Sequence, residues 1–232
     1  MNRGIIRKIY REKSIEHIQS KINQLGINRK YNFDAVMFLN IRVITTILVG
    51  IFFILFSNIK TFLIPFIIII YYNLFYYVFI TSSINKRIKK LDREALTFFE
   101  ILTLSLESGK NLENALEITC YNIDSELSSE FKRSLFEMKF GRSLMETLED
   151  LKKRIPSETI NNIILNITQT SVFGNSIIET MNNQIDYLRD KQVMEIKSQI
   201  NKIPNKVSII SVIFIVPLIL LIILGPFIIG LL

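Results

Sequence analysis

The 232-residue chain has few of the side chains on which catalytic and metal sites depend. It contains no tryptophan, one cysteine (Cys120) and one histidine (His17). A single cysteine excludes an intramolecular disulfide. One cysteine and one histidine are too few to provide the ligands of a Cys/His zinc site, and we identify no catalytic Cys-His pair. His17 lies in a basic segment, where we expect an exposed surface position. The composition therefore predicts a protein that is not an enzyme and uses no metal or cofactor.

A nucleotide site is also missing. Gly109 and Lys110 resemble the end of a phosphate-binding loop, but residue 104 is leucine where the loop needs glycine, and residue 111 is asparagine where it needs serine or threonine. Carboxylates are numerous, yet they are interleaved with lysine and arginine. That pattern is typical of a solvated helix face, with an interaction surface as the alternative. Our candidate partner contacts are Lys152, Lys153 and Arg154.

Long apolar runs are what the sequence has in excess, since hydrophobic residues make up 49% of it. Residues 61–80 and 207–232 carry no charge, and a shorter uncharged run covers residues 43–57. About twenty residues at 1.5 Å each cross a bilayer core of roughly 30 Å. We expect two transmembrane helices within residues 36–81, joined by a turn at Asn58, and a third over residues 205–232.

Positive charge is concentrated near the first apolar run. The formal net charge is +7, yet residues 86–206 contain equal numbers of basic and acidic residues, and most of the excess lies in residues 1–35. A neutral central domain argues against nucleic-acid binding, which needs a basic patch. Basic residues beside a first span keep that end in the cytosol. The pattern predicts a multi-pass protein of the cytoplasmic (inner) membrane, with a cytosolic N-terminus and an external C-terminus.

Between the second and third spans, one pattern occurs three times at nearly constant spacing. A glycine ends one helical stretch, and two residues later comes a residue suited to cap the next helix. Two of the three turns also have the glutamate of a capping box. The turn residues are Gly109 and Asn111; Gly141, Ser143 and Glu146; and Gly174, Ser176 and Glu179. The repeat predicts three helical hairpins, or six helices, in a cytosolic domain over residues 86–204.

Apolar residues in this domain recur with the spacing of helices that bury one face. The stripes are Ala95, Phe98, Phe99, Leu102 and Leu106; Leu144, Leu148, Leu151 and Ile155; and Ile160, Ile163, Ile164 and Ile167. The sixth helix, over residues 175–203, is longer than the bundle needs, and we expect Pro204 to break it before the last span. The fold class is predicted as an all-α integral membrane protein: a transmembrane hairpin, a cytosolic six-helix bundle and a C-terminal transmembrane helix.

Residues 3–25, within the N-terminal segment 1–35, are predicted to form a basic amphipathic helix. Its apolar stripe is Ile15, Ile18, Ile22 and Leu25, and Gly26 ends it. Such a helix can lie on the anionic inner leaflet as a juxtamembrane anchor, which is the interpretation that we favour. Packing on the helical domain or on a partner is the alternative.

Two polar residues, Arg42 and Asn73, fall within the first two spans. An ionisable residue in a membrane is a functional hypothesis by default, and it makes a transporter or channel component the alternative function. Arg42 lies near the cytosolic end of its span, where its side chain can reach the headgroups. We therefore assign Arg42 to anchoring in the lipid membrane. A membrane enzyme is a third possibility, which the missing histidine, cysteine and phosphate-loop sites argue against.

The order of two spans, a six-helix domain with glycine turns and a final span resembles the type II secretion system F-domain family, and most closely its tight-adherence (Tad) pilus branch. The resemblance covers residues 36–232. Many pilus and secretion members carry a Gly-Glu-x-Ser-Gly signature before the third turn, whereas residues 168–174 have no acidic residue here. The stretches that carry the match are residues 104–116, 141–148, 169–177 and 203–206, with Pro217, Gly225 and Pro226.

The resemblance implies a non-enzymatic platform protein of the inner membrane in a type IV pilus-like machine. Such a platform contacts a cytosolic hexameric ATPase and passes its conformational work to pilin subunits drawn from the membrane. Many family members have two F domains and this chain has one. The resemblance therefore implies a homodimer or pairing with a paralogous platform subunit.

Overall fold

The computed structural model describes residues 12–26, 34–56, 64–173 and 177–229, and every regular element in these ranges is a helix. By clustering of contacts, the chain divides into two compact units, Met1–Asn182 and Asn183–Leu232. The all-α fold class predicted from the sequence is therefore confirmed, together with three helices that are long and apolar enough to cross a membrane.

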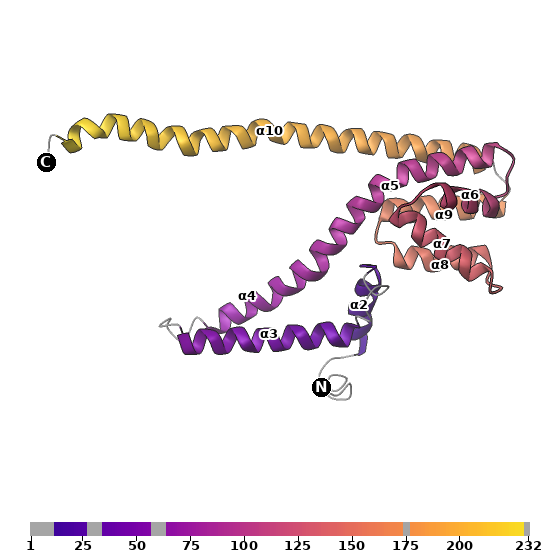
Figure 1. Ribbon diagram of the computed structural model, residues 1–232, viewed down its shortest axis with the longest axis horizontal. Helices are drawn as coiled ribbons and strands as arrows, with labels where there is room; N and C mark the ends of the chain where they lie inside the picture. The colour runs from indigo at the N-terminus through magenta and orange to yellow at the C-terminus, as the bar shows by residue number, and fades with distance from the viewer. Residues whose placement is uncertain (1–11, 27–33, 57–63, 174–176, 230–232) are drawn as a thin grey trace. The chain divides into compact units, whose positions relative to one another are not determined.

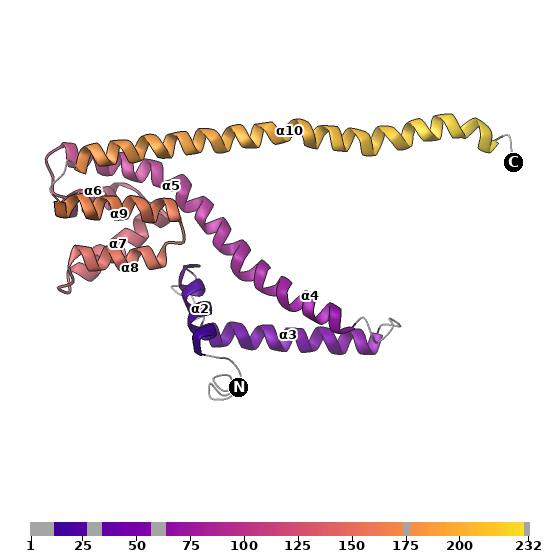
Figure 2. The same ribbon diagram turned by 180° about the vertical axis from the view of Figure 1, so that it is seen from behind.

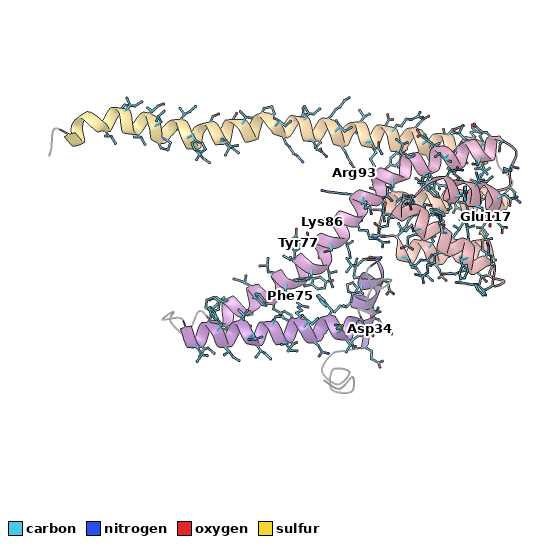
Figure 3. All side chains as sticks on the ribbon, viewed as in Figure 1. Asp34, Phe75, Tyr77, Lys86, Arg93 and Glu117 are labelled. Atoms are coloured by element: carbon cyan, nitrogen blue, oxygen red, sulfur yellow. The ribbon has the colours of Figure 1, made fainter. Side chains whose placement is uncertain are left out.

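The first two candidate spans pack against each other as a hairpin of α3 (Ala35–Phe56) and α4 (Ile64–Tyr76) (Figure 1). Both helices are almost entirely apolar and leave most of that surface exposed, as helices in contact with lipid do. The predicted turn at Asn58 lies outside the described residues. Phe75, labelled in Figure 3, fills the space between the two helices, with its ring centroid 5.8 Å from that of Phe38.

The helix that contains the second span continues beyond its apolar part. It runs through a short π-helix, Tyr77–Thr81, into α5 (Ser82–Glu107), so that the apolar span and the first helix of the bundle are one continuous helix (Figure 1). The candidate span in this helix is Pro65–Glu107, whose 43 residues measure about 65 Å at 1.5 Å per residue. We refer to the helix from α4 to α5 as the stem.

Four short helices pack beside the far end of the stem, and both views show them there (Figures 1 and 2). Their bounds are α6, Leu112–Asn122; α7, Glu126–Met138; α8, Leu144–Arg154; and α9, Glu158–Phe173. All three predicted apolar stripes face the core, except that Leu144 is half-buried. Phe98 stacks on Phe131 at 4.6 Å between ring centroids, and Phe99 meets both rings edge-on. This aromatic cluster joins the stem to α7.

The N-terminal helix α2 (Glu12–Asn23) packs within the chain. Its residues Ile18 and Ile22 are buried in a cluster with α3, the π-helix and the start of α5. Gln19 adds a hydrogen bond, since its Oε1 accepts from the backbone N–H of Ala35 at 2.9 Å. Because the apolar stripe is buried against protein, these contacts favour packing over the leaflet-anchor interpretation. The part of the predicted helix before Glu12 lies outside the described residues.

The last helix, α10, runs without interruption from Ile177 to Ile229, and the expectation that Pro204 would break it is wrong. Proline at a helix interior removes one N–H and therefore one backbone hydrogen bond, which bends a helix without having to end it. Here the helix continues across that position into the apolar run. The unit that contains the third span accordingly begins within α10, at Asn183.

Candidate functional site

The most connected polar side chain in the described residues is Arg87, a buried cation of the stem with 6% exposure. Its Nε donates to Glu126 Oε1 at 2.6 Å and its Nη2 donates to Glu130 Oε1 at 2.7 Å. Its Nη1 donates to the backbone oxygens of Gln24, at 2.5 Å, and Arg154, at 3.0 Å. One guanidinium therefore joins the stem, α7, the end of α8 and the segment that follows α2.

The helical phase of the stem explains why Arg87 is buried while its neighbours are not. Ile84, Leu91 and Ala95 are buried, and Arg87 lies on the same face at spacings of three and four residues. Lys86 and Arg93, labelled in Figure 3, are exposed. Arg87 lies in a cluster of basic residues with Lys86, Lys89 and Lys90, and the sequence analysis did not distinguish it from them. The continued apolar phase is the signal that singles out Arg87.

Pairing with carboxylates compensates the burial of this charge. A buried cation is costly unless it is paired and its hydrogen-bond donors are satisfied. Burial alone would raise the pKa of Glu126, but hydrogen bonds from Arg87 and from Lys90, at 3.0 Å, outweigh it and hold that pKa below its usual value. The same contact raises the pKa of Lys90. Both groups are therefore charged at neutral pH.

Arg154 extends the network from Arg87 into α7. Its Nε donates to Glu130 Oε2 at 3.2 Å, and its Nη2 donates to Ser134 Oγ at 2.9 Å. Its Nη1 lies 3.6 Å from Glu137 Oε1. Glu130 is thus shared by two arginines, one from the stem and one from α8, and this shared carboxylate ties the two elements together.

A cleft of about 580 Å³ opens beside this network, between the end of α2 and the α7–α8 pair. Its charged lining is Glu130, Glu137, Asp150, Arg133, Arg142, Lys153 and Arg154. The cations are paired with the carboxylates, as where Arg142 Nη2 lies 2.5 Å from Asp150 Oδ2. Hydrogen bonds from Lys153 and Arg142 lower the pKa of Asp150 to about 2. The cleft is therefore nearly neutral and internally paired.

The structure separates the three predicted partner contacts. Lys153 is well exposed and pairs with Asp150, and Lys152 pairs with Glu149 on the same helix. Arg154, in contrast, has only 12% of its side chain exposed and belongs to the internal network, so it is not a surface contact. The three cations are adjacent in the sequence, which gives no sign that their exposure differs. Arg154 is the last residue of α8, and its side chain points inward to Glu130.

Two of the three glycine turns lie in the described residues. Gly109 has φ of 82° and Gly141 has φ of 88°, in the left-handed region that glycine enters most readily. The Asn111 side chain caps α6 by accepting from Asn114 N. Ser143 and Glu146 form a complete capping box at α8. The third turn, with Gly174 and Ser176, lies outside the described residues, and Glu179 is in the first turn of α10.

Arg42, which we predict to anchor its span in the membrane, is bound within the protein. It is 7% exposed, and its Nε and Nη2 donate to the backbone oxygen of Tyr72, at 3.2 and 2.9 Å. Its guanidinium carbon lies 3.4 Å from the centroid of the Tyr72 ring and 5.4 Å from that of Tyr76. The positive charge of Arg42 is therefore stabilised inside the hairpin by cation–π attraction and by a carbonyl oxygen of the neighbouring helix. Arg42 thus connects α3 to α4 within the hairpin.

Catalytic and metal-binding groups remain scattered in the part of the chain that the structure describes. Those residues contain no group of three or more histidine, cysteine or acidic side chains placed to hold a metal ion. His17 is exposed on α2. Cys120 is buried, and its burial raises the pKa of the thiol to about 11, which leaves it protonated and unreactive in the folded protein. The polar contacts of Arg87 and Arg154 instead connect the stem, α7 and α8.

Comparison with known proteins agrees with this arrangement. The family model for the type II secretion system (T2SS), protein F, matches residues 98–225, which is more than half of the chain. The searches of curated proteins and of solved structures found no match. The matched region begins in the stem and extends through the helical bundle to the last apolar run. On this match, the chain belongs to the family of type II secretion system protein F.

Proposed function

We propose that this protein is a non-enzymatic platform of the inner membrane that couples a cytosolic hexameric ATPase to pilin polymerisation. Proteins of its family are non-catalytic platform components that generally work with an ATPase and pilins in secretion machines. The N-terminus and the helical bundle are placed in the cytosol, and the C-terminus outside, because the basic residues flank the first span.

The observation that carries this proposal is the continuous stem. A push or rotation applied to the bundle acts on a helix that is itself the second apolar span. Arg87 fixes the stem to α7, α8 and the N-terminal segment, so the elements are expected to move together. Movement of the bundle is thereby passed to the membrane without a nucleotide site in this chain.

We further propose that the machine is of the tight-adherence type. The supporting feature is the sequence before the third turn, where residues 168–174 lack the glutamate of the signature found in many pilus and secretion members. With one F domain, the platform also needs either a second copy or a paralogous subunit.

The surface that we assign to the ATPase lies on α6, α7 and the turn that follows α7. Tyr121 is 88% exposed, Phe136 is 59% exposed and Phe140 is 74% exposed, with the last two rings in edge contact at 4.9 Å. Tyr121 and Phe136 line a groove of about 400 Å³ with Lys132 among its other residues. Aromatic side chains on an otherwise polar surface are frequent anchors of protein interfaces. Lys153, on α8, is a second exposed candidate.

Deletion and complementation test the proposal. A deletion strain is expected to retain pilins in the membrane and to make no surface fibres, and the wild-type gene should restore them. Phe140→Ser should fail to restore fibres and should lose copurification with the ATPase. Leu104→Ser is the matched control, since Leu104 is also a well-exposed apolar residue, at 63%, but lies on α5. Normal fibres in the deletion strain, with no paralogue present, would refute the platform role.

The transporter alternative has less support than it had from the sequence. Its two candidate residues both donate hydrogen bonds to backbone oxygens of α4. Arg42 donates to Tyr72, and Asn73 Nδ2 donates to Ile69 at 2.9 Å. Neither arrangement lines a path across the span.

A further inference from the structure

The unit from Asn183 onward carries an exposed apolar seam on α10 that the coupling role does not explain. Before the last apolar run, this helix is polar and contains charges of both signs. Six apolar residues of α10, each 47–57% exposed, nevertheless recur at alternating spacings of three and four; four lie in this polar part and two at the start of the apolar run. They are Val193, Ile196, Ile200, Ile203, Val207 and Ile210.

The spacing identifies the kind of partner that this seam fits. Alternation of three and four averages 3.5 residues, which is the heptad period of a helix wound around another helix. In a heptad written abcdefg, the a and d positions face the partner helix. Here the a positions are Val193, Ile200 and Val207, and the d positions are Ile196, Ile203 and Ile210. Ser198 lies at the f position on the opposite face. Pro204 falls at an e position beside the seam, so the uninterrupted helix carries the seam past it into the membrane run.

Three features favour another copy of the same chain as that partner. Every copy enters the membrane in the same direction, which makes their α10 helices parallel. Parallel copies in register place like residues in the same layers, so side-chain volumes match throughout the seam. The flanking residues Gln192 (g) and Lys197 (e) then face each other, and this pairing avoids like charges. Confinement to one membrane raises the effective concentration of the helices.

We propose that copies of this chain associate through residues 193–210 of α10 as a parallel, in-register coiled coil that runs from the cytosolic side into the membrane. Isoleucine at the d positions shifts coiled coils from two strands towards three or four. The proposal rests on α10 alone and does not depend on the pilus function.

Cysteine crosslinking in native membranes tests the seam. The full-length protein is produced in one cell with two different tags, and single cysteines replace Ile196, Ile200 or Ile203. Ser198→Cys is the matched control, because f positions of paired helices are about 20 Å apart, or two helix diameters. Buried Cys120 is retained, and the parent protein measures its background. A short thiol crosslinker should give products that carry both tags at the three seam positions and lose them at Ser198.

Equal crosslinking at Ser198 and at the seam would overturn the proposal, because it would mean random collision. A product that carries one tag and an additional protein would replace self-association with a different partner. Seam cysteines that resist labelling but give no intermolecular product would mean that the seam is covered within its own chain. As a second measure, Ile200→Asp should lower the native mass of the purified protein to that of a monomer, while Ser198→Asp should leave it unchanged. Both readouts are independent of fibre assembly.

Discussion

Replacing Arg87 by methionine should destabilise the helical bundle strongly. Methionine keeps much of the side-chain volume but removes the charge, so the partly buried carboxylates of Glu126 and Glu130 lose a partner. Breaking a buried ion pair in this way costs about 3–5 kcal/mol. Glu126 retains Lys90 and Glu130 retains Arg154, so we expect the lower end, about 3 kcal/mol.

The unique cysteine provides the assay in a protein without tryptophan. Cys120 is buried in α6, so pulse labelling with a maleimide during urea titration reports when the bundle unfolds. With an m-value of about 1.5 kcal/mol/M, a loss of about 3 kcal/mol lowers the urea midpoint by about 2 M. Lys86→Met is the control, since Lys86 is the exposed neighbour and its replacement should change stability by less than about 0.5 kcal/mol.

A double substitution distinguishes the ion network from simple packing. Adding Glu130→Gln to Arg87→Met removes the charge of one of the two carboxylates that lose Arg87, so the double variant should be more stable than the sum of the single effects predicts. The reasoning would be refuted if Arg87→Met and Lys86→Met shifted the midpoint equally. Strict additivity of the two substitutions would also contradict it.

The remaining predictions concern pH, the turns and the topology. Because the folded-state pKa of Glu126 lies below its ordinary value of 4.5, its pairing stabilises the protein above that pH and is lost as the pH falls through the folded pKa. Glu126→Gln should therefore lower the urea midpoint at pH 7, with the difference from wild type vanishing in acid. Gly141→Val should cost more than about 1 kcal/mol, because β-branched residues avoid positive φ, while the open space there adds no clash. Ser143→Ala should cost about 1 kcal/mol in the same titration through the lost cap; unchanged midpoints for both would contradict the turn geometry. A cysteine at Asn58 should react with an impermeant reagent on intact cells, whereas a cysteine at the exposed bundle residue Lys110 should not, and the reverse result would invert the topology.

Elements with a local cause were predictable from the sequence. The glycine turns need a residue with left-handed backbone conformation followed by a helix cap, and the sequence has both, two positions apart, at Gly141 and Ser143. Apolar stripes such as Phe98, Phe99 and Leu102 appear as helical periodicity because one face of each helix is buried. Charge asymmetry and apolar length likewise marked the candidate spans before any contact was known.

The candidate site was harder to predict because its determinants come from distant segments. Arg87 and Arg154 are 67 residues apart, and the helical phase that singles out Arg87 does not reveal that both side chains bind Glu130. The partner of Arg42 was hidden for the same reason, since the carbonyl that binds it belongs to Tyr72 on the facing helix. Pro204 was misjudged because helix-breaking rules describe one residue, whereas the long flanking runs of α10 maintain the helix across it.

The short π-helix at Tyr77–Thr81 lies between α4 and α5 in the stem. A π turn accommodates one more residue than an α turn, and one residue corresponds to about 100° of rotation around an α-helix. Because the π turn takes up one extra residue within a single turn, removing one residue there should restore a regular α-helix and keep the lipid-facing side of α4 and the bundle-facing side of α5 at nearly the same angle to each other. Adding one residue to the regular part of α4 instead should rotate the bundle by about 100° relative to α4, with the contacts of Arg87 to Glu126 and Glu130 intact. The register between membrane and cytosol is therefore encoded as a residue count in the stem.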